Sequence, residues 1–189
     1  MQKISMLALG LFLSVSVFAQ TWNLDKAHSQ LNFSITHLTI SSIEGQFRSV
    51  TATITSSKDD FSDAVVELSA DAGSVNTGID ARDNHLKSDA FFDVAKYPTL
   101  TFKSTSFKQI DAKNYAVTGD LTFHGVTKSV TLNATYNGTV ANPMSKKATA
   151  GFKITGTIKR SDFNVGTSFP EAMLSDAVLL DANTEFTKG

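Results

Sequence analysis

The sequence predicts an all-β fold: an antiparallel β-barrel of about eight strands with a short helical insertion around residues 79–92. Most of the chain alternates apolar residues with Thr and Ser in short runs separated by turn residues, as half-buried strands do. Only Asn76–Pro98 abandons this period of two over a long interval. A β-sandwich would fit the same runs, but inward-facing Gly and separated Phe residues favour a barrel whose interior is incompletely filled.

The first 19 residues are predicted to be a signal peptide, because Lys3 precedes the apolar run Met6–Phe18 and Val17-Phe18-Ala19 fits a cleavage site. The apolar run is shorter than the roughly 20 residues that span a bilayer. No integral membrane segment is therefore expected in the mature chain, residues 20–189. We expect it to form one domain that is periplasmic or secreted.

Charge and cysteine content exclude several classes of protein. The chain has 17 basic and 18 acidic residues with no basic block or stripe, so nucleic acid is not an expected partner. The absence of cysteine rules out disulfides, thiolate metal sites and a lipoprotein anchor at the predicted cleavage point. Stability must therefore come from sheet hydrogen bonds and buried apolar surface, which a closed barrel supplies.

Three strands are predicted before the helical insertion: Gln30–Leu38, Ile43–Thr55 and Ala64–Val75. In the second of these, the inward phase changes around Arg48 and Ser49, which indicates a β-bulge. After the insertion, alternation predicts five further strands: Thr99–Ile110, Tyr115–Phe123, Val126–Tyr136, Ala148–Ile158 and Val178–Phe186.

The sequence also predicts the connections between these later strands. His124-Gly125 predicts a tight turn, and a loop is predicted to begin at Asn137-Gly138 and to run past Asn142-Pro143. Arg160–Ser175 is expected to be irregular, with one helical turn at Glu171–Leu174.

In the helical insertion, Ile79, Arg82, His85 and Leu86 recur close to one helical stripe, while Asp80 and Asp83 lie off it and are expected to serve the helix N-terminus. Phe91 and Phe92 follow at once. Arg and His beside a cluster of apolar rings could place a polar contact next to a lipid pocket. The same helix could instead plug one end of the barrel, and the spacing does not decide between the two.

No pattern in the sequence predicts catalysis. The histidines, His28, His37, His85 and His124, lack the spacing of a metal motif. No Gly-x-Ser-x-Gly elbow is present to aim a serine at a substrate. We therefore expect no metal site, no catalytic residue and no catalytic cofactor.

Phenylalanine is the one residue in excess, and five of its 14 copies occupy the inward phase of predicted strands: Phe33, Phe47, Phe102, Phe123 and Phe152. They could form an ordinary core or line a pocket. Each buried methylene contributes roughly 0.8 kcal/mol, whereas association costs about 4–15 kcal/mol. Such a pocket would therefore favour tails of about ten or more carbons.

Four motifs resemble those of the YceI family: Trp22-x-Leu24-Asp25-x-x-His28-Ser29, Arg82-Asp83-x-His85-Leu86, Gly119-x-Leu121-Thr122-x-x-Gly125-Val126-Thr127-Lys128 and Arg160-x-Asp162-Phe163. The resemblance covers essentially the whole mature chain. It implies an exported bacterial protein with a lipocalin-like antiparallel barrel that encloses a polyisoprenoid or similar long amphiphile. One departure is Asn164, where members of the family commonly have glycine.

The resemblance also implies a binding group made of Arg82 and His85, with Phe91 and Phe92 beside them and His28 near the same mouth. The expected function is non-catalytic: to bind and sequester or carry a long-chain isoprenoid or related lipid. Two alternatives are an enzyme that uses His85 or His28 as a base and a filled-core envelope protein that binds a protein partner. A homodimer is left open.

Overall fold

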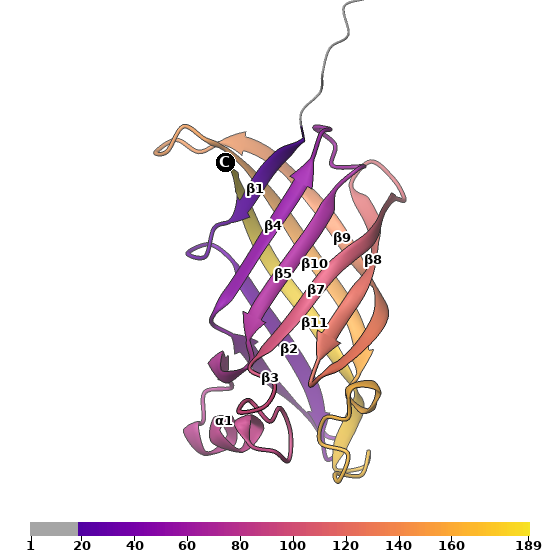
Figure 1. The fold of residues 1–189 in the computed structure, drawn as a ribbon. Coiled ribbons are helices and arrows are strands. Elements are labelled where there is room, and N and C mark those ends of the chain that lie inside the picture. The colour runs from indigo at the N-terminus through magenta and orange to yellow at the C-terminus, as the bar shows by residue number, and fades with distance from the viewer. Residues whose placement is uncertain (1–18) are drawn as a thin grey trace, which may run out of the picture.

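The computed structural model describes residues 19–189 (Figure 1). The predicted signal peptide, apart from Ala19, lies outside the described residues. Strands dominate the fold, and the α-helix is short. In chain order the elements are β1 (Gln20–Leu24), β2 (Gln30–His37), β3 (Ser41–Phe47), β4 (Val50–Ser56), β5 (Val65–Asp71), the 3₁₀ helix η1 (Ala72–Ser74), β6 (Val75–Asn76), α1 (Asp80–Lys87), β7 (Thr99–Gln109), β8 (Asn114–Phe123), β9 (Val126–Ala141), β10 (Ala148–Lys159), η2 (Arg160–Phe163) and β11 (Leu174–Lys188).

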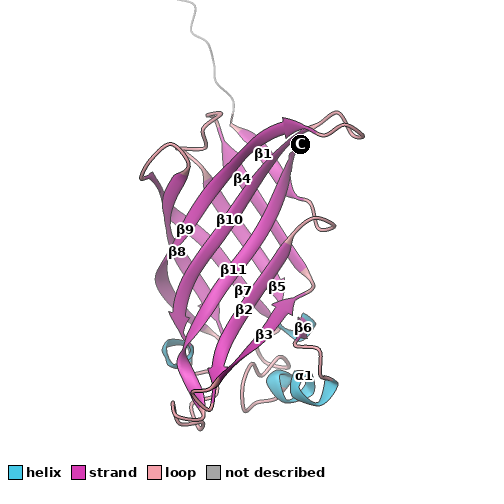
Figure 2. Cartoon of the chain, turned by 180° about the vertical axis from the view of Figure 1, so that it is seen from behind, coloured by secondary structure: helices cyan, strands magenta, loops and turns pink. Residues whose placement is uncertain are grey.

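The strands occupy eight positions around a closed barrel (Figures 1 and 2). Strands β1 and β2 share one position, because both pair with β11 at successive places along it. β3 and β4 share the next position by pairing with β2 and β1, and β6 and β5 share the third by pairing with β3 and β4. Strands β7 to β11 follow in order, all antiparallel, and β11 closes the ring. The predicted antiparallel barrel of about eight strands is confirmed.

Two predicted strands are divided in the structure. The predicted strand Ile43–Thr55 is interrupted at Arg48 and Ser49, which separate β3 from β4, so the change of phase was predicted at the right place. The predicted strand Ala64–Val75 stops pairing with its neighbours after Asp71, where the 3₁₀ helix η1 follows. The Asp71 carboxylate caps this helix by accepting a hydrogen bond from the Gly73 N–H. A side chain that caps a local turn competes with the sheet in this way.

The N-terminal strand β1 was missed, since it has only five residues and buries only Trp22. The predicted start of the loop at Asn137-Gly138 is wrong, because β9 continues to Ala141. Gly138 pairs with Gly151 and Tyr136 pairs with Phe152, which leaves Asn137 as the extra residue of a β-bulge. The Asn-Gly pair therefore bends a strand here instead of ending it.

One end of the barrel is closed by the loop between β4 and β5. This loop turns Phe61 inward until its side chain is 1% exposed. The Phe61 ring lies 5.2 Å from Trp22 and 5.2 Å from Phe152, with Tyr136 at 5.4 Å. The other end carries α1 and the segment between β10 and β11, as Figure 1 shows.

Candidate functional site

An elongated cavity of about 430 Å³ lies inside the barrel. Its wall is overwhelmingly apolar and includes all five Phe residues predicted to face inward: Phe33, Phe47, Phe102, Phe123 and Phe152. Arg82, His85, Phe91 and Phe92 also line it. The structure thus brings nine of the ten predicted site residues to one cavity, and their contact with a ligand stays a prediction.

The cavity is much longer than it is wide. Along β11 its wall extends from Leu174 to Phe186, which is roughly 40 Å at about 3.3 Å per residue. Barrel strands tilt by about 35–45°, so the lining spans roughly 30 Å along the axis. A volume of about 430 Å³ spread over that length leaves a narrow channel, which suits one flexible chain better than a compact ligand.

The free space does not come from the inward glycines, contrary to the sequence interpretation. A Cβ atom placed on Gly119 would lie 2.5 Å from the Phe102 ring, and one on Gly156 would overlap the Leu132 side chain. Neighbouring side chains therefore already occupy these positions. The space instead lies between side chains such as Leu31, Ile35 and Leu180, which line the cavity and are only half-buried.

Aromatic rings wall the cavity at the α1 end of the barrel. Phe91 stacks on Phe169 with 4.9 Å between ring centroids, and the His85 ring meets the Phe91 ring edge-on at 5.0 Å. Phe92 lies 5.1 Å from Phe123 and 6.0 Å from Phe47. The insertion therefore forms part of the cavity wall, whereas the plug that the sequence left open is supplied at the opposite end by Phe61.

The predicted helical stripe is partly wrong. Helix α1 ends at Lys87, so Phe91 and Phe92 lie in the turns that follow it. Ile79 is 53% exposed, while Asp83, assigned off the stripe, is only 5% exposed. The reason is polar: the Asp83 carboxylate turns back to accept from the backbone N–H and the hydroxyl of Thr77 at 2.8 and 2.6 Å.

A polar network joins this helix to the barrel wall. Arg82 donates from Nε to the Thr77 hydroxyl at 2.7 Å and from Nη2 to the Thr77 carbonyl at 2.8 Å. The Asn76 amide lies 3.4 Å from Asp83 and accepts from Arg48 Nη2 at 3.0 Å. Both arginines line the cavity. Arg48 was missed as a site residue, and its one signal was a cation where the inward phase of an apolar strand breaks.

The family model for the YceI-like domain matches residues 22–186 of this chain. The chain belongs to the YceI-like family. A UPF0312 protein of Staphylococcus aureus is 35% identical to it over 162 residues, which cover 86% of this chain and 91% of the relative. The crystal structure of a Campylobacter jejuni YceI protein matches with a TM-score of 0.74 at 36% identity, over 82% of this chain and 90% of that one.

A solved domain from Saccharophagus degradans, named a polyisoprenoid binding domain, has the same fold. It matches with a TM-score of 0.67 at 19% identity, over 90% of this chain and 99% of that one. The resemblance to the YceI family drawn from four sequence motifs is thus confirmed, and so is the barrel that it implied.

Arg160, in the last of the YceI motifs, lines the cavity but is already fully engaged. Its guanidinium donates five hydrogen bonds of 2.5–3.2 Å to backbone carbonyls between Val165 and Ser175. A guanidinium has five N–H donors, so none remains for a ligand. Asn164, the departure from the family pattern, has φ 57° in the left-handed region that Asn tolerates better than most residues.

His28 does not line the cavity of this YceI-like barrel. It is exposed in the connection between β1 and β2, where its Nδ1 lies 2.8 Å from an Asp25 carboxylate oxygen. The hydrogen bond that His28 donates to the Asp25 carboxylate raises the pKa of His28 above its usual value. Asp25, His28 and Glu185 place one possible metal-ligand atom each within 4.8 Å of one another. The expected absence of a metal site stays a prediction.

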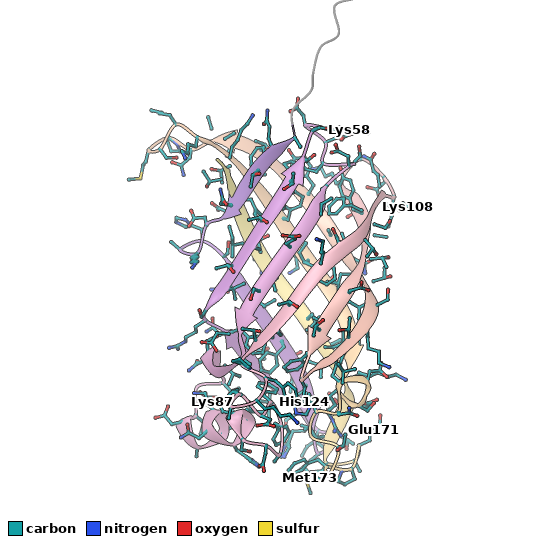
Figure 3. The ribbon with its side chains drawn as sticks, viewed as in Figure 1. Lys58, Lys87, Lys108, His124, Glu171 and Met173 are labelled. Carbon is teal, nitrogen blue, oxygen red and sulfur yellow. The ribbon has the colours of Figure 1, made fainter. Side chains whose placement is uncertain are left out.

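The α1 end gathers side chains from distant parts of the chain. Figure 3 shows Lys87, His124, Glu171 and Met173 at this end, whereas Lys58 and Lys108 lie at the end that carries the Phe61 loop.

The predicted turn at His124-Gly125 is present, with φ 49° and 74° at its two residues. None of the helices within residues 19–189 is long and apolar enough to cross a membrane.

Proposed function

We propose that this YceI-like protein binds a long-chain isoprenoid or related amphiphilic lipid in its barrel and sequesters or carries it in the periplasm, without a chemical step. The observation that carries the proposal is the shape and chemistry of the cavity: long, narrow, apolar and stopped at one end by the Phe61 loop. A filled core, the alternative reading of the Phe residues, would not leave about 430 Å³ inside the barrel.

Energetics favour a long tail over a short one. With about 0.8 kcal/mol per buried methylene, a tail of about ten carbons gains roughly 8 kcal/mol, which lies within the 4–15 kcal/mol that association costs. A tail that occupies most of the roughly 30 Å lining would exceed that cost. The solved Saccharophagus degradans domain, named for polyisoprenoid binding, supports this ligand class through a shared fold.

The proposal that no reaction occurs is supported by the surroundings of the histidines. The His85 ring is held by the rings of Phe91 and Phe169, and within residues 19–189 its nitrogens have no hydrogen-bond partner. A general base is normally oriented by a second polar group.

The proposed periplasmic location rests on the signal peptide expected at residues 1–19.

Native mass spectrometry of the purified protein, followed by solvent extraction, tests the proposed function. We expect a lipid adduct that extraction removes and that reappears when a long-chain isoprenoid alcohol or fatty acid is added. An empty barrel in repeated preparations, with no uptake of either added lipid, would refute the proposal. Turnover of a bound lipid that disappears in His85→Ala while binding persists would refute the non-catalytic part.

A further inference from the structure

The charged side chains on the cavity wall all carry the same sign. Among the described residues they are Lys26, Arg48, Arg82 and Arg160, and no Asp or Glu lines the cavity. The chain as a whole has 18 acidic and 17 basic residues, so this separation does not follow from composition. In an apolar surrounding, a charge interacts more strongly with its counter-charge than it does in water.

Two of these cations are placed to meet a ligand. Arg160 has no donor left, whereas Arg82 uses only Nε and one bond from Nη2, and Arg48 uses only one bond from Nη2. Within residues 19–189, the Nη1 group of each of these two arginines has no hydrogen-bond partner, and neither arginine forms an ion pair. Their remaining N–H groups can therefore bind an anion.

The nearby carboxylate does not neutralise this pair by direct contact. Asp83 is buried, and its oxygens accept from Thr77 and Asn76, the same two residues that hold Arg82 and Arg48. The network therefore holds Arg82 by two hydrogen bonds and the more exposed Arg48 by one, while the carboxylate stays off the cavity wall. An arginine held by its other donors loses less side-chain entropy when it binds an anion.

Arg48 lies at the boundary between the cavity and the outside. It also lines a separate polar recess, which contains Asp80, Asp83 and Lys87. The acidic side chains are on the recess side and the apolar rings are on the cavity side. An amphiphile with its tail in the barrel would therefore have its polar end near Arg48 and Arg82, on the side that holds no carboxylate.

We propose that the ligand is an anionic single-chain amphiphile, whose carboxylate or phosphate is bound between Arg48 and Arg82 while its tail fills the barrel. This proposal rests on the proposed function and adds the charge of the head group and the residues that select it. Guanidinium groups bind both kinds of anion through paired N–H donors. A neutral alcohol with the same tail lacks that charge-assisted interaction.

The test compares ligands that differ only in the head group. Isothermal titration of the delipidated protein at pH 7.5 would measure geranylgeranyl monophosphate against geranylgeraniol, and palmitate against hexadecanol. Hydrogen bonds to charged groups contribute about 1.5–3 kcal/mol, so we expect each anion to bind about tenfold or more tightly than its alcohol. The larger of the two preferences identifies the head group as phosphate or carboxylate.

Arg48→Met and Arg82→Met should each bring the ratio of the alcohol Kd to the anion Kd closer to one, while leaving the affinity for the alcohols nearly unchanged. Lys108→Met, which removes a charge at the opposite end of the barrel, should leave the preference intact. Circular dichroism checks that each variant is folded. If Arg82→Met unfolds α1 because the bonds to Thr77 are lost, the result for Arg48→Met alone decides the test.

Two results would overturn the proposal while leaving the proposed function in place: equal affinity for anion and alcohol in the unaltered protein, or a preference that survives in both arginine variants. Failure of all four ligands to bind would overturn the proposed function together with this extension.

Discussion

At the scale of single residues, Arg160 shows how a buried charge can organise a segment without serving a ligand. Its five donors meet five backbone carbonyls, and its side chain is only 7% exposed. The segment between β10 and β11 has few ladder hydrogen bonds of its own, so these bonds set its path. The same segment carries Phe169, which stacks against Phe91 in the cavity wall.

Arg160→Lys should therefore destabilise the protein although it keeps the charge. A lysine ammonium has three donors on a compact head, so at least two carbonyls would lose their partner, at a cost of about 1–3 kcal/mol each. We expect the free energy of unfolding in urea to fall by about 2–6 kcal/mol. Lys159→Arg, the reverse exchange at the exposed neighbouring position, is the control. A loss below about 0.5 kcal/mol would contradict the role assigned to Arg160.

Gly119 is required by packing rather than by backbone conformation. A Cβ atom there would lie 2.5 Å from the Phe102 ring and 2.6 Å from the Lys103 carbonyl oxygen, and the backbone oxygen cannot move aside easily. Gly119→Ala should reduce the free energy of unfolding by about 1–3 kcal/mol. Gly151→Ala is the matched control, since its added Cβ would meet nothing closer than 3.6 Å. Equal stability of the two variants in urea would refute the close-packing argument.

At the scale of elements, period-two alternation predicted the strands well wherever a strand has one buried face. Tyr115–Phe123 and Ala148–Ile158 are present almost residue for residue as β8 and β10. Alternation could not find β1, because five residues with one buried side chain carry too little pattern. It also could not tell that Asn137-Gly138 forms a bulge, since a bulge depends on the partner strand.

The candidate site was predictable to the extent that it follows from local pattern. Inward Phe residues identify the cavity wall, and the family motif identifies Arg82 and His85. The position of Arg48 depends on a hydrogen bond to a residue 28 positions away along the chain, and the burial of Asp83 depends on hydrogen bonds to Thr77, which precedes the helix by three residues. Spacing within one helix does not contain that information, so Ile79 was placed on the stripe and Asp83 off it.

The loop between β4 and β5 holds Phe61 in the barrel end and depends on one carboxylate. Asp63 accepts from the hydroxyls of Ser56 and Ser57, and from the Ser57 backbone N–H at 3.1 Å. The hydroxyl bonds, that of Ser56 first and Ser57 second, lower the pKa of Asp63 from 3.8 to about 2. A lowered folded-state pKa means that this stabilisation is complete above pH of about 4 and is lost as the pH falls toward 2.

Asp63→Asn should therefore reduce stability at pH 7 by about 1 kcal/mol, a modest value because the side chain is exposed to solvent. Urea unfolding between pH 7 and pH 2 should show the difference from the unaltered protein shrinking as the pH falls below about 4. Asp59→Asn is the control, since within residues 19–189 the Asp59 carboxylate accepts no hydrogen bond. A difference that is independent of pH would show that the Asp63 charge does not act through these bonds.

At the scale of the whole molecule, the two ends of the barrel have different chemistry. The Phe61 end is a packed aromatic cluster, while the α1 end combines rings with Arg48, Arg82 and His85. A chain-like ligand should therefore enter with a fixed polarity, its tail directed toward Phe61. The position of Phe61 then limits the length of tail that the protein can bury.

A series of fatty acids of increasing length tests this limit. Each additional buried methylene should strengthen binding by about 0.8 kcal/mol, or roughly fourfold in Kd, until the tail reaches the Phe61 cluster. Longer tails should gain nothing further. Fluorescence of Phe123→Trp provides the readout, because residue 123 lines the cavity, whereas the native Trp22 lies in the cluster at the closed end and should respond little.

Ala182→Phe provides the variant that distinguishes a length limit from a solubility limit. Ala182 is a lining residue of β11 on the way to the closed end, so a ring at this position should shorten the usable channel. The plateau should then begin at a shorter tail, while the affinity for the shortest acids stays the same. A plateau that begins at the same tail length in both proteins would mean that Phe61 does not set the limit and that the tail lies elsewhere.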